Sequence, residues 1–235
     1  MERIILFQSI RTERFVPLLS YESMDAGNAA PLSGRRAQAA RNDVRILDAA
    51  RTVFVADPDA PISAVAEQAG VGISAVYRRY ENKEDLLRRL CADGLGRYIA
   101  AAEAALADSE APGEAFAEFM RRVVDADTHA LTLRLAGMFE PTDELRREAA
   151  RAQELNAQLV ERGKAAGVIR ADLVPEDLSC VFEQLAAIRV GDDERTKELR
   201  HRYLALQLDA LDGSHKGELP GRAPSWQEIS QRWER

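Results

Sequence analysis

The chain repeats apolar and polar positions with the period of an α-helix along almost its whole length. Apolar residues recur at three- and four-residue spacing, and runs of β-branched residues are short. Proline, glycine and aspartate interrupt the period at "DPDAP" (57–61), "DSEAPGE" (108–114) and "GDD" (191–193). The pattern predicts an all-α protein, whose expected helices lie at about 38–56, 61–70, 74–80, 82–106, 113–126, 129–138, 142–165, 175–190 and 193–212.

Residues 61–80 are predicted to form a helix-turn-helix, two short helices joined by "GVG". Gly70 supplies the positive φ that the tight turn needs, and Ala66 must be small because the second helix crosses close to it. The small core of this motif is expected to consist of Val65, Ala66, Ala69, Val71 and Val76. An ordinary helical hairpin with a charged outer face is the alternative.

The second helix of the motif has two different faces. At 100° per residue, Ile73, Val76 and Tyr80 point inward, while Ser74 and Arg78 point outward. Short side chains at the start of the helix allow close approach to a DNA major groove, and an arginine further along reaches a base edge or a phosphate. The next helix starts at once, where Asn82 and Asp85 have the spacing of a capping box.

Only the first helical block of the chain has a charge balance that is compatible with DNA binding. The net charge is −7, but residues 34–90 carry ten Lys/Arg against eight Asp/Glu, whereas residues 91–235 carry 19 against 27. The first helical block is therefore mildly basic within an acidic chain.

Several other classes of protein are disfavoured. No apolar run approaches the roughly 18 residues of a membrane span, and the N-terminus lacks a secretory signal, so a cytoplasmic protein is expected. Cys91 and Cys180 are expected to be reduced thiols, and no metal-ligand spacing occurs. His129 lies near Asp125 and Asp127, but a solvated histidine is favoured over an acid–base pair. We expect no catalytic residue, no metal and no cofactor, which makes an enzyme the least favoured alternative.

The segment "IxxVAxxAGVGxxxVYRRYxNKEDLL" (62–87) resembles the DNA-binding signature of the tetracycline-repressor (TetR) family, "IAxxAGVSxGTLYxHFxSKEAL". It is most similar to the subset that reads "AGVGxGTLYRHFPTREALL". The resemblance spans residues 39–90 and departs from the usual form at Gly72, Ser74, Ala75 and Arg79, so the operator sequence does not carry over from relatives.

The resemblance implies a role for specific residues. Family members commonly hold the phosphate backbone with the residues that fall at Tyr77 and Lys83, and Lys83 also lies at a helix N-terminus, which attracts phosphate. Arg35 and Arg36 precede the expected first helix, where a basic arm can enter a minor groove, although a solvated pair is an equal alternative. The expected DNA-binding residues are Ser74, Ala75, Tyr77, Arg78, Arg79, Lys83, Arg35 and Arg36.

The resemblance also implies about nine helices, a C-terminal regulatory domain, and a homodimer built by the last two helices. The dimer stripe is expected at Val181, Leu185, Ile188, Leu199, Tyr203, Leu206 and Leu211, unless it packs within its own subunit. Such a dimer presents two recognition helices about 34–36 Å apart to a palindromic operator.

A small-molecule effector of unknown identity is expected in the regulatory domain. Residues that line a cavity, should one exist, are expected at Phe116, Phe119, Met120, His129, Leu133, Arg134, Met138, Phe139, Leu155, Leu159 and Phe182. Apolar residues at helical spacing are usually core, so only some of these are expected to touch a ligand.

The ends of the chain lie outside the resemblance. Residues 1–33 lack helical periodicity and read as a poorly ordered extension, with Met1 or Met24 as the initiator. Residues 213–224 read as a linker, and "SWQEISQRWER" (225–235) predicts a short helix that docks the face of Trp226, Ile229 and Trp233, with a disordered tail as the alternative.

The sequence thus predicts an N-terminal extension (1–33), a DNA-binding domain (34–90), a ligand-binding and dimerisation domain (91–212) and a C-terminal tail (213–235). The expected function is that of a transcriptional regulator, most readily a ligand-responsive repressor. A ligand-independent DNA-binding protein and an activator remain alternatives.

Overall fold

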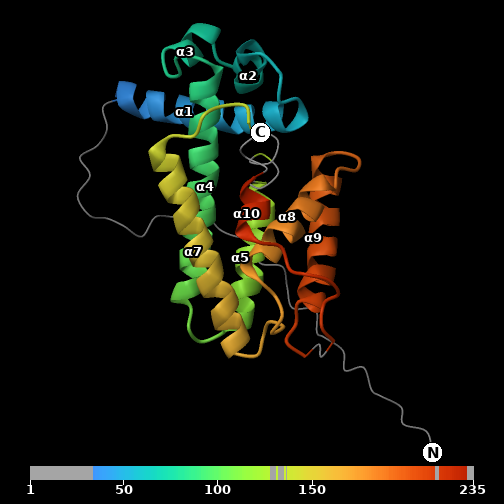
Figure 1. Cartoon of the computed structure of the whole chain (residues 1–235). Coiled ribbons are helices and arrows are strands. Elements are labelled where there is room, and N and C mark those ends of the chain that lie inside the picture. Colours follow the sequence, from blue (N-terminus) through green and yellow to red (C-terminus); the bar gives the residue numbers. More distant parts are fainter. Residues whose placement is uncertain (1–33, 128–130, 132–134, 136, 215–216, 232–235) are drawn as a thin grey trace, which may run out of the picture. The chain divides into compact units, whose positions relative to one another are not determined.

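The computed structural model describes residues 34–127, 131, 135, 137–214 and 217–231. Within this part of the chain every regular element is a helix, which confirms the all-α prediction (Figure 1). The nine described helices are α1 (Gly34–Ala56), α2 (Ile62–Ala69), α3 (Ile73–Tyr77), α4 (Lys83–Ala107), α5 (Pro112–Ala126), α7 (Asp143–Ala165), α8 (Pro175–Ala187), α9 (Asp193–Ala210) and α10 (Trp226–Ser230).

Contacts divide the chain into two compact units, Met1–Gln38 and Ala39–Arg235. The second unit contains α2 to α10 and the part of α1 from Ala39 onward. The expected extension 1–33 lies outside the described residues, as does most of the helix expected at 129–138. Leu131 and Leu135 are described there, and both are helical and 1% exposed.

The first helix begins earlier than its pattern predicted. α1 starts at Gly34 rather than near residue 38, so Arg35 and Arg36 have helical backbone instead of preceding the helix. Their expected position before the first helix is therefore wrong, whereas the contact of a basic arm with a minor groove stays a prediction, since their side chains lie outside the described part of the chain.

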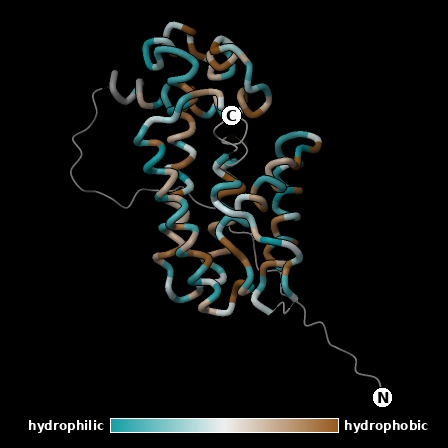
Figure 2. Tube along the Cα trace, in the orientation of Figure 1, coloured by the Kyte–Doolittle hydropathy of each residue, from teal (hydrophilic) through white to brown (hydrophobic). Residues whose placement is uncertain are grey.

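Two hydrophobic clusters share α4. Leu86, Leu87 and Leu90 at the start of α4 pack with α1, α2 and α3, whereas residues further along α4, such as Ala102, pack with α5, α7, α8 and α9. Apolar and polar positions alternate along these helices, as Figure 2 shows, so each helix turns one face to a cluster. We call the cluster of α1, α2, α3 and the start of α4 the helix-turn-helix cluster, and the other the regulatory cluster, after the domains expected there. The single helix α4 contributes to both.

Close packing of α7 against the chain that follows it leaves no room for a side chain at Gly163. A Cβ on Gly163 would lie 2.1 Å from Cδ1 and 2.6 Å from Cγ1 of Ile169, a residue that is 3% exposed. We expect Gly163→Ala to lower the free energy of unfolding by about 1–3 kcal/mol because of overpacking, despite the better helix propensity of alanine. Chemical denaturation of the purified protein measures this.

Gly96 provides the matched control. It also lies within a helix, but a Cβ there meets nothing within 4 Å. Gly96→Ala should therefore raise stability by about 0.5–1 kcal/mol. Equal effects of the two substitutions would contradict the packing described around Gly163.

The C-terminal tail forms the predicted short helix but docks differently. Ser225 and Glu228 make the expected capping box, and α10 contacts α8. Of the predicted docking face, Ile229 is 6% exposed and buried as expected, whereas Trp226 is 42% exposed. Trp233 lies outside the described residues.

Candidate nucleic-acid interface

The turn between α2 and α3 has the predicted left-handed glycine. Gly70 has φ 62° and ψ 39° and ends α2, while the N–H of Val71 donates to the carbonyl of Ala66 at 3.0 Å. A Cβ on Gly70 would also lie 3.0 Å from Nη2 of Arg45, which donates to the carbonyl of Ala69 at 2.6 Å. Backbone conformation and close approach both select glycine here.

The inward face of α3 is confirmed except at its first residue. α3 ends at Tyr77, earlier than the expected end at residue 80. Val76 of α3 and Tyr80 beyond its end are 0% and 3% exposed, and Ala66 of α2 is 4% exposed where the two helices cross. Ile73, predicted to point inward, is instead 45% exposed. Ile73 is the first residue of α3, directly after the turn. Its position on the helical wheel was therefore not sufficient to predict whether it is buried.

The outward face of α3 carries the predicted contact residues. Ser74, Tyr77 and Arg78 are exposed and Ala75 is half-buried, with Tyr77 at 52% exposure. A serine near the helix start followed by a tyrosine and an arginine suits a major groove: small at the point of closest approach, with hydroxyl and guanidinium donors further along.

Arg79 differs from Arg78 because its guanidinium is hydrogen-bonded to a carboxylate of the same chain. Its Nε and Nη2 donate to the two carboxylate oxygens of Asp43 at 2.9 and 2.7 Å, and Tyr80 Oη donates to the same carboxylate at 2.6 Å. Sequence reasoning missed Asp43, since nothing in the pattern of α1 marks a residue that pairs across 36 positions.

Lys83 lies at the start of α4, where the resemblance implied a phosphate contact. Asn82 Oδ1 accepts from the N–H of Asp85 as predicted, but the Asp85 carboxylate accepts from the N–H of Glu81 and not of Asn82. Lys83 Nζ donates to the carbonyl of Pro58 at 2.9 Å and lies 5.2 Å from the centre of the Phe54 ring. An ammonium has three N–H donors, so this position leaves it able to bind a phosphate as well.

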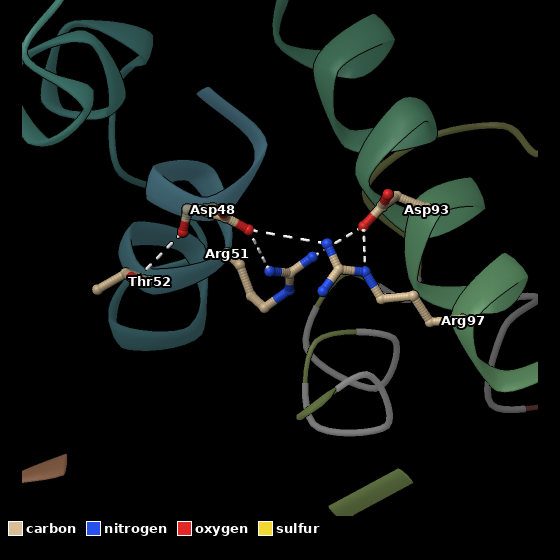
Figure 3. Close-up of polar contacts among 5 residues, drawn as sticks. All are labelled: Asp48, Arg51, Thr52, Asp93 and Arg97. Atoms are coloured by element: carbon tan, nitrogen blue, oxygen red, sulfur yellow. Dashed lines mark hydrogen bonds and ion pairs between the residues drawn. The ribbon is translucent and has the colours of Figure 1, made fainter. Parts of the chain in front are cut away.

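A charged junction joins α1 to α4 (Figure 3). Arg51 donates to Asp48 on its own helix and to Asp93 on α4, both at 2.9 Å, and Arg97 Nε donates to Asp93 at 2.9 Å. Arg51 is 14% exposed in its side chain, so this link is shielded from solvent. We name Asp48, Arg51, Asp93 and Arg97 the α1–α4 junction.

The regulatory cluster is built around aromatic rings. Phe119 lies edge-on to Tyr98 and Phe182, with ring centres 5.4 and 6.1 Å apart, and Tyr98 Oη donates to Asn156 Oδ1 at 2.8 Å. Burial raises the pKa of the Tyr98 hydroxyl, so it stays protonated and a donor. Tyr98 and Asn156 form the polar pair of this cluster, and sequence reasoning overlooked both.

The predicted pocket residues separate into three groups. Met138 and Phe139 pack against the helix-turn-helix cluster rather than the regulatory one, so the structure does not bring them to the others. His129, Leu133 and Arg134 lie outside the described residues. The group that does come together, in the regulatory cluster, consists of Phe116, Phe119, Met120, Leu155, Leu159 and Phe182.

Arg200 of α9 lies against a small cavity beside this cluster. The cavity has a volume of about 10 Å³, close to that of a single water site, and Phe182 and Leu185 are among its lining residues. Arg200 is 6% exposed, pairs with Asp127 at 2.9 Å, and donates to the carbonyl of Ala186 at 3.0 Å.

Comparison with known proteins identifies the family. Residues 46–90 match "Bacterial regulatory proteins, tetR family", and residues 111–212 match "Transcriptional regulator SbtR-like, C-terminal domain". Together the two matches cover well over half of the chain. The protein belongs to the TetR family of transcriptional regulators.

Solved TetR structures share this fold. A TetR regulator from Mycobacterium vanbaalenii is 27% identical, with a TM-score of 0.53 over 76% of this chain and 99% of its own. A TetR regulator from Streptomyces coelicolor is also 27% identical, with a TM-score of 0.53 over 74% of this chain and 99% of its own. LfrR from Mycobacterium smegmatis, solved in complex with proflavine, is 23% identical, with a TM-score of 0.53 over 77% of this chain and 99% of its own. No curated protein sequence matches the chain.

The predicted dimer stripe of this TetR protein divides by exposure. Val181, Leu185 and Leu211 are 8%, 2% and 7% exposed within a single subunit, which supports the alternative that they pack in their own core. Ile188 and Leu199 are half-buried, and Tyr203 and Leu206 on α9 are 47% and 58% exposed. The expected contact with a second subunit is therefore concentrated on α9.

No helix among the described residues has the length and apolar character to cross a membrane. No group of three or more His, Cys, Asp or Glu side chains in that part of the chain comes together as metal ligands would.

Proposed function

We propose that this TetR regulator is a homodimeric repressor that binds a palindromic operator and is released by a small molecule. The observation that carries the proposal is the exposed recognition surface of α3, where Ser74, Tyr77 and Arg78 are exposed while Val76 and Tyr80 anchor the segment in the core. A rigidly held helix with short residues first and an arginine later is suited to direct readout in a major groove.

Dimerisation through α9 supports the palindromic form of the operator. Tyr203 and Leu206 are large apolar side chains that a monomer leaves in water, and half-buried Leu199 lies on the same helix. Two subunits related by a two-fold axis place their recognition helices one DNA turn apart, about 34–36 Å, and so read the same half-site twice.

Ligand response is supported by the connection between the two clusters. α4 contributes to both, and the α1–α4 junction ties it to the helix-turn-helix domain. We expect a molecule that separates the rings around Phe119 to displace α4 and, with α4, the helix-turn-helix domain. The proflavine complex of LfrR makes a small organic effector the natural class to test first.

Reciprocity gives this regulation a direct test. An effector that lowers operator affinity by some factor must bind the operator complex more weakly by the same factor. Titration of an identified effector with and without operator measures both. Equal effector affinities would instead favour the second candidate function, a DNA-binding protein or activator that responds to no ligand.

Operator binding itself is tested at Arg78. Selection from random duplexes should yield a palindrome, and Arg78→Ala should weaken binding to it by about 1–3 kcal/mol, mainly at one position of each half-site. The expected location of this activity is the bacterial cytoplasm.

Lys83→Ala is the matched control for Arg78→Ala. Loss of a phosphate contact should weaken binding to the operator and to random duplex alike, and should flatten the dependence of log K on log salt by about one unit. If neither substitution changes binding, α3 and the start of α4 are not the DNA-binding surface.

A further inference from the structure

Asp43 of α1 holds the end of the recognition segment through three hydrogen bonds. It accepts a bidentate pair from Arg79, at 2.9 and 2.7 Å, and a third bond from Tyr80 Oη at 2.6 Å. A bidentate contact between a guanidinium and a carboxylate fixes angle as well as distance. The chain that leaves α3 is therefore held against α1 by two consecutive residues.

One partner of this contact is largely buried, unlike in an ordinary surface ion pair. The side chain of Asp43 is 13% exposed and Tyr80 is 3% exposed, whereas the side chain of Arg79 is 55% exposed. Burial acts to raise the pKa of the Asp43 carboxyl, but the hydrogen bonds from Arg79 and Tyr80 prevail and lower the pKa below its usual value. The hydrogen bond to Asp43 in turn raises the pKa of the Arg79 guanidinium. Both groups are charged at neutral pH.

Arg78 and Arg79 therefore enter DNA binding in different states. Both are exposed, but the charge of Arg79 is already matched by a carboxylate at hydrogen-bonding distance. A DNA phosphate gains little from a guanidinium whose charge is neutralised, and drawing it away leaves Asp43 unpaired close to the DNA.

We propose that Asp43 is a positioning residue that sets DNA specificity: it retains Arg79 on α1 and leaves Arg78 as the arginine that meets the DNA. Without Asp43, Arg79 becomes an additional phosphate-binding cation. Such a contact strengthens binding to every sequence equally, and so reduces the ratio of operator affinity to random-duplex affinity. The carboxylate limits non-specific binding at the edge of the recognition surface.

The test compares Asp43→Asn with Arg79→Ala and with the double variant. Asparagine keeps the size of the side chain and can still accept from Tyr80 Oη, but it lacks the charge that retains Arg79. Affinity for a random-sequence duplex is measured between 50 and 200 mM salt, with circular dichroism and thermal unfolding recorded for each variant. A random duplex needs no identified operator.

The expected result is a change in salt dependence for one variant only. Asp43→Asn should steepen the slope of log K against log salt by about 0.9, so that its advantage over the wild type is about 3.5-fold larger at 50 mM than at 200 mM. Arg79→Ala should leave the slope of the wild type unchanged, and the double variant should restore it. Tyr80→Phe, which loses a hydroxyl but keeps the ion pair, should also bind with the wild-type slope.

Two outcomes overturn the proposal. If Arg79→Ala alone flattens the slope by about one unit, Arg79 binds DNA in the wild type and Asp43 does not retain it. If Asp43→Asn folds as the wild type does and leaves the slope unchanged, the carboxylate does not restrain a cation. The inference rests on DNA binding through α3. A wild type that binds random duplex without selecting a palindrome refutes the operator proposal. The comparison of variants on random duplex still decides the role of Asp43 in that case.

Discussion

Replacement of Phe119 by alanine is expected to lower the free energy of unfolding by about 3–5 kcal/mol. Phe119 is 1% exposed, and its ring lies edge-on to Tyr98 and Phe182 at interplanar angles of 83° and 80°. The substitution removes buried apolar surface and two favourable ring contacts, and it leaves a cavity among α4, α5 and α8 that rigid helices cannot close. Chemical denaturation at a fixed subunit concentration measures the change, because the proposed dimerisation would couple to stability.

Tyr77→Ala is the matched control for Phe119→Ala. Tyr77 is also an aromatic residue on a helix, but it is 52% exposed and touches the proposed DNA surface. Its replacement should change stability by no more than about 0.5 kcal/mol while weakening DNA binding. A stability loss below about 1 kcal/mol for Phe119→Ala would mean that the aromatic cluster is loosely packed, a state in which an effector could enter without displacing α4.

Local chemistry explains which parts of this fold are predictable from sequence. Gly70, Asn82 and the Ser225–Glu228 pair act within four residues of themselves, through backbone conformation or capping hydrogen bonds, and each does what its pattern predicts. The family signature adds the helix-turn-helix and the place of α3 on its surface. Such features depend little on the rest of the chain.

Residues that act across the fold were not predictable in the same way. Asp43 reaches Arg79 across 36 positions and Arg51 reaches Asp93 across 42, and the helical period identifies neither partner. The apolar period also fails to say which residues are covered: Val44 and Leu47 have helical spacing on α1, yet Val44 is 57% exposed and Leu47 is 5% exposed. Val181 and Leu185 were expected at a dimer interface and are buried in the subunit's own core. The apolar period does not distinguish the two, because a stripe on α8 fits a partner subunit and the chain's own core equally well.

Arg200→Ala is expected to lower the free energy of unfolding by about 2–4 kcal/mol. The side chain of Arg200 is 7% exposed and pairs with Asp127 at 2.9 Å, while its Nε and Nη2 donate to the carbonyls of Ile188 and Ala186 beyond and within the end of α8. Alanine leaves the carboxylate and both carbonyls without these donors. Asp127 is 24% exposed and can take up water, so the loss should stay below that of a fully buried pair.

Lys197→Ala on the same helix tests whether burial or charge causes the stability loss expected for Arg200→Ala. Lys197 is 66% exposed and lies 3.3 Å from Asp125, which is 40% exposed, so its removal should cost no more than about 0.5 kcal/mol. Arg200→Lys should recover part of the stability, because it keeps the charge beside Asp127 but cannot reach two carbonyls with a planar fork. If Arg200→Ala and Lys197→Ala have the same small effect, the ends of α5 and α8 are not held together by Arg200. A large effect of Arg200→Ala alone makes this guanidinium the polar anchor that ties α9 to the regulatory core.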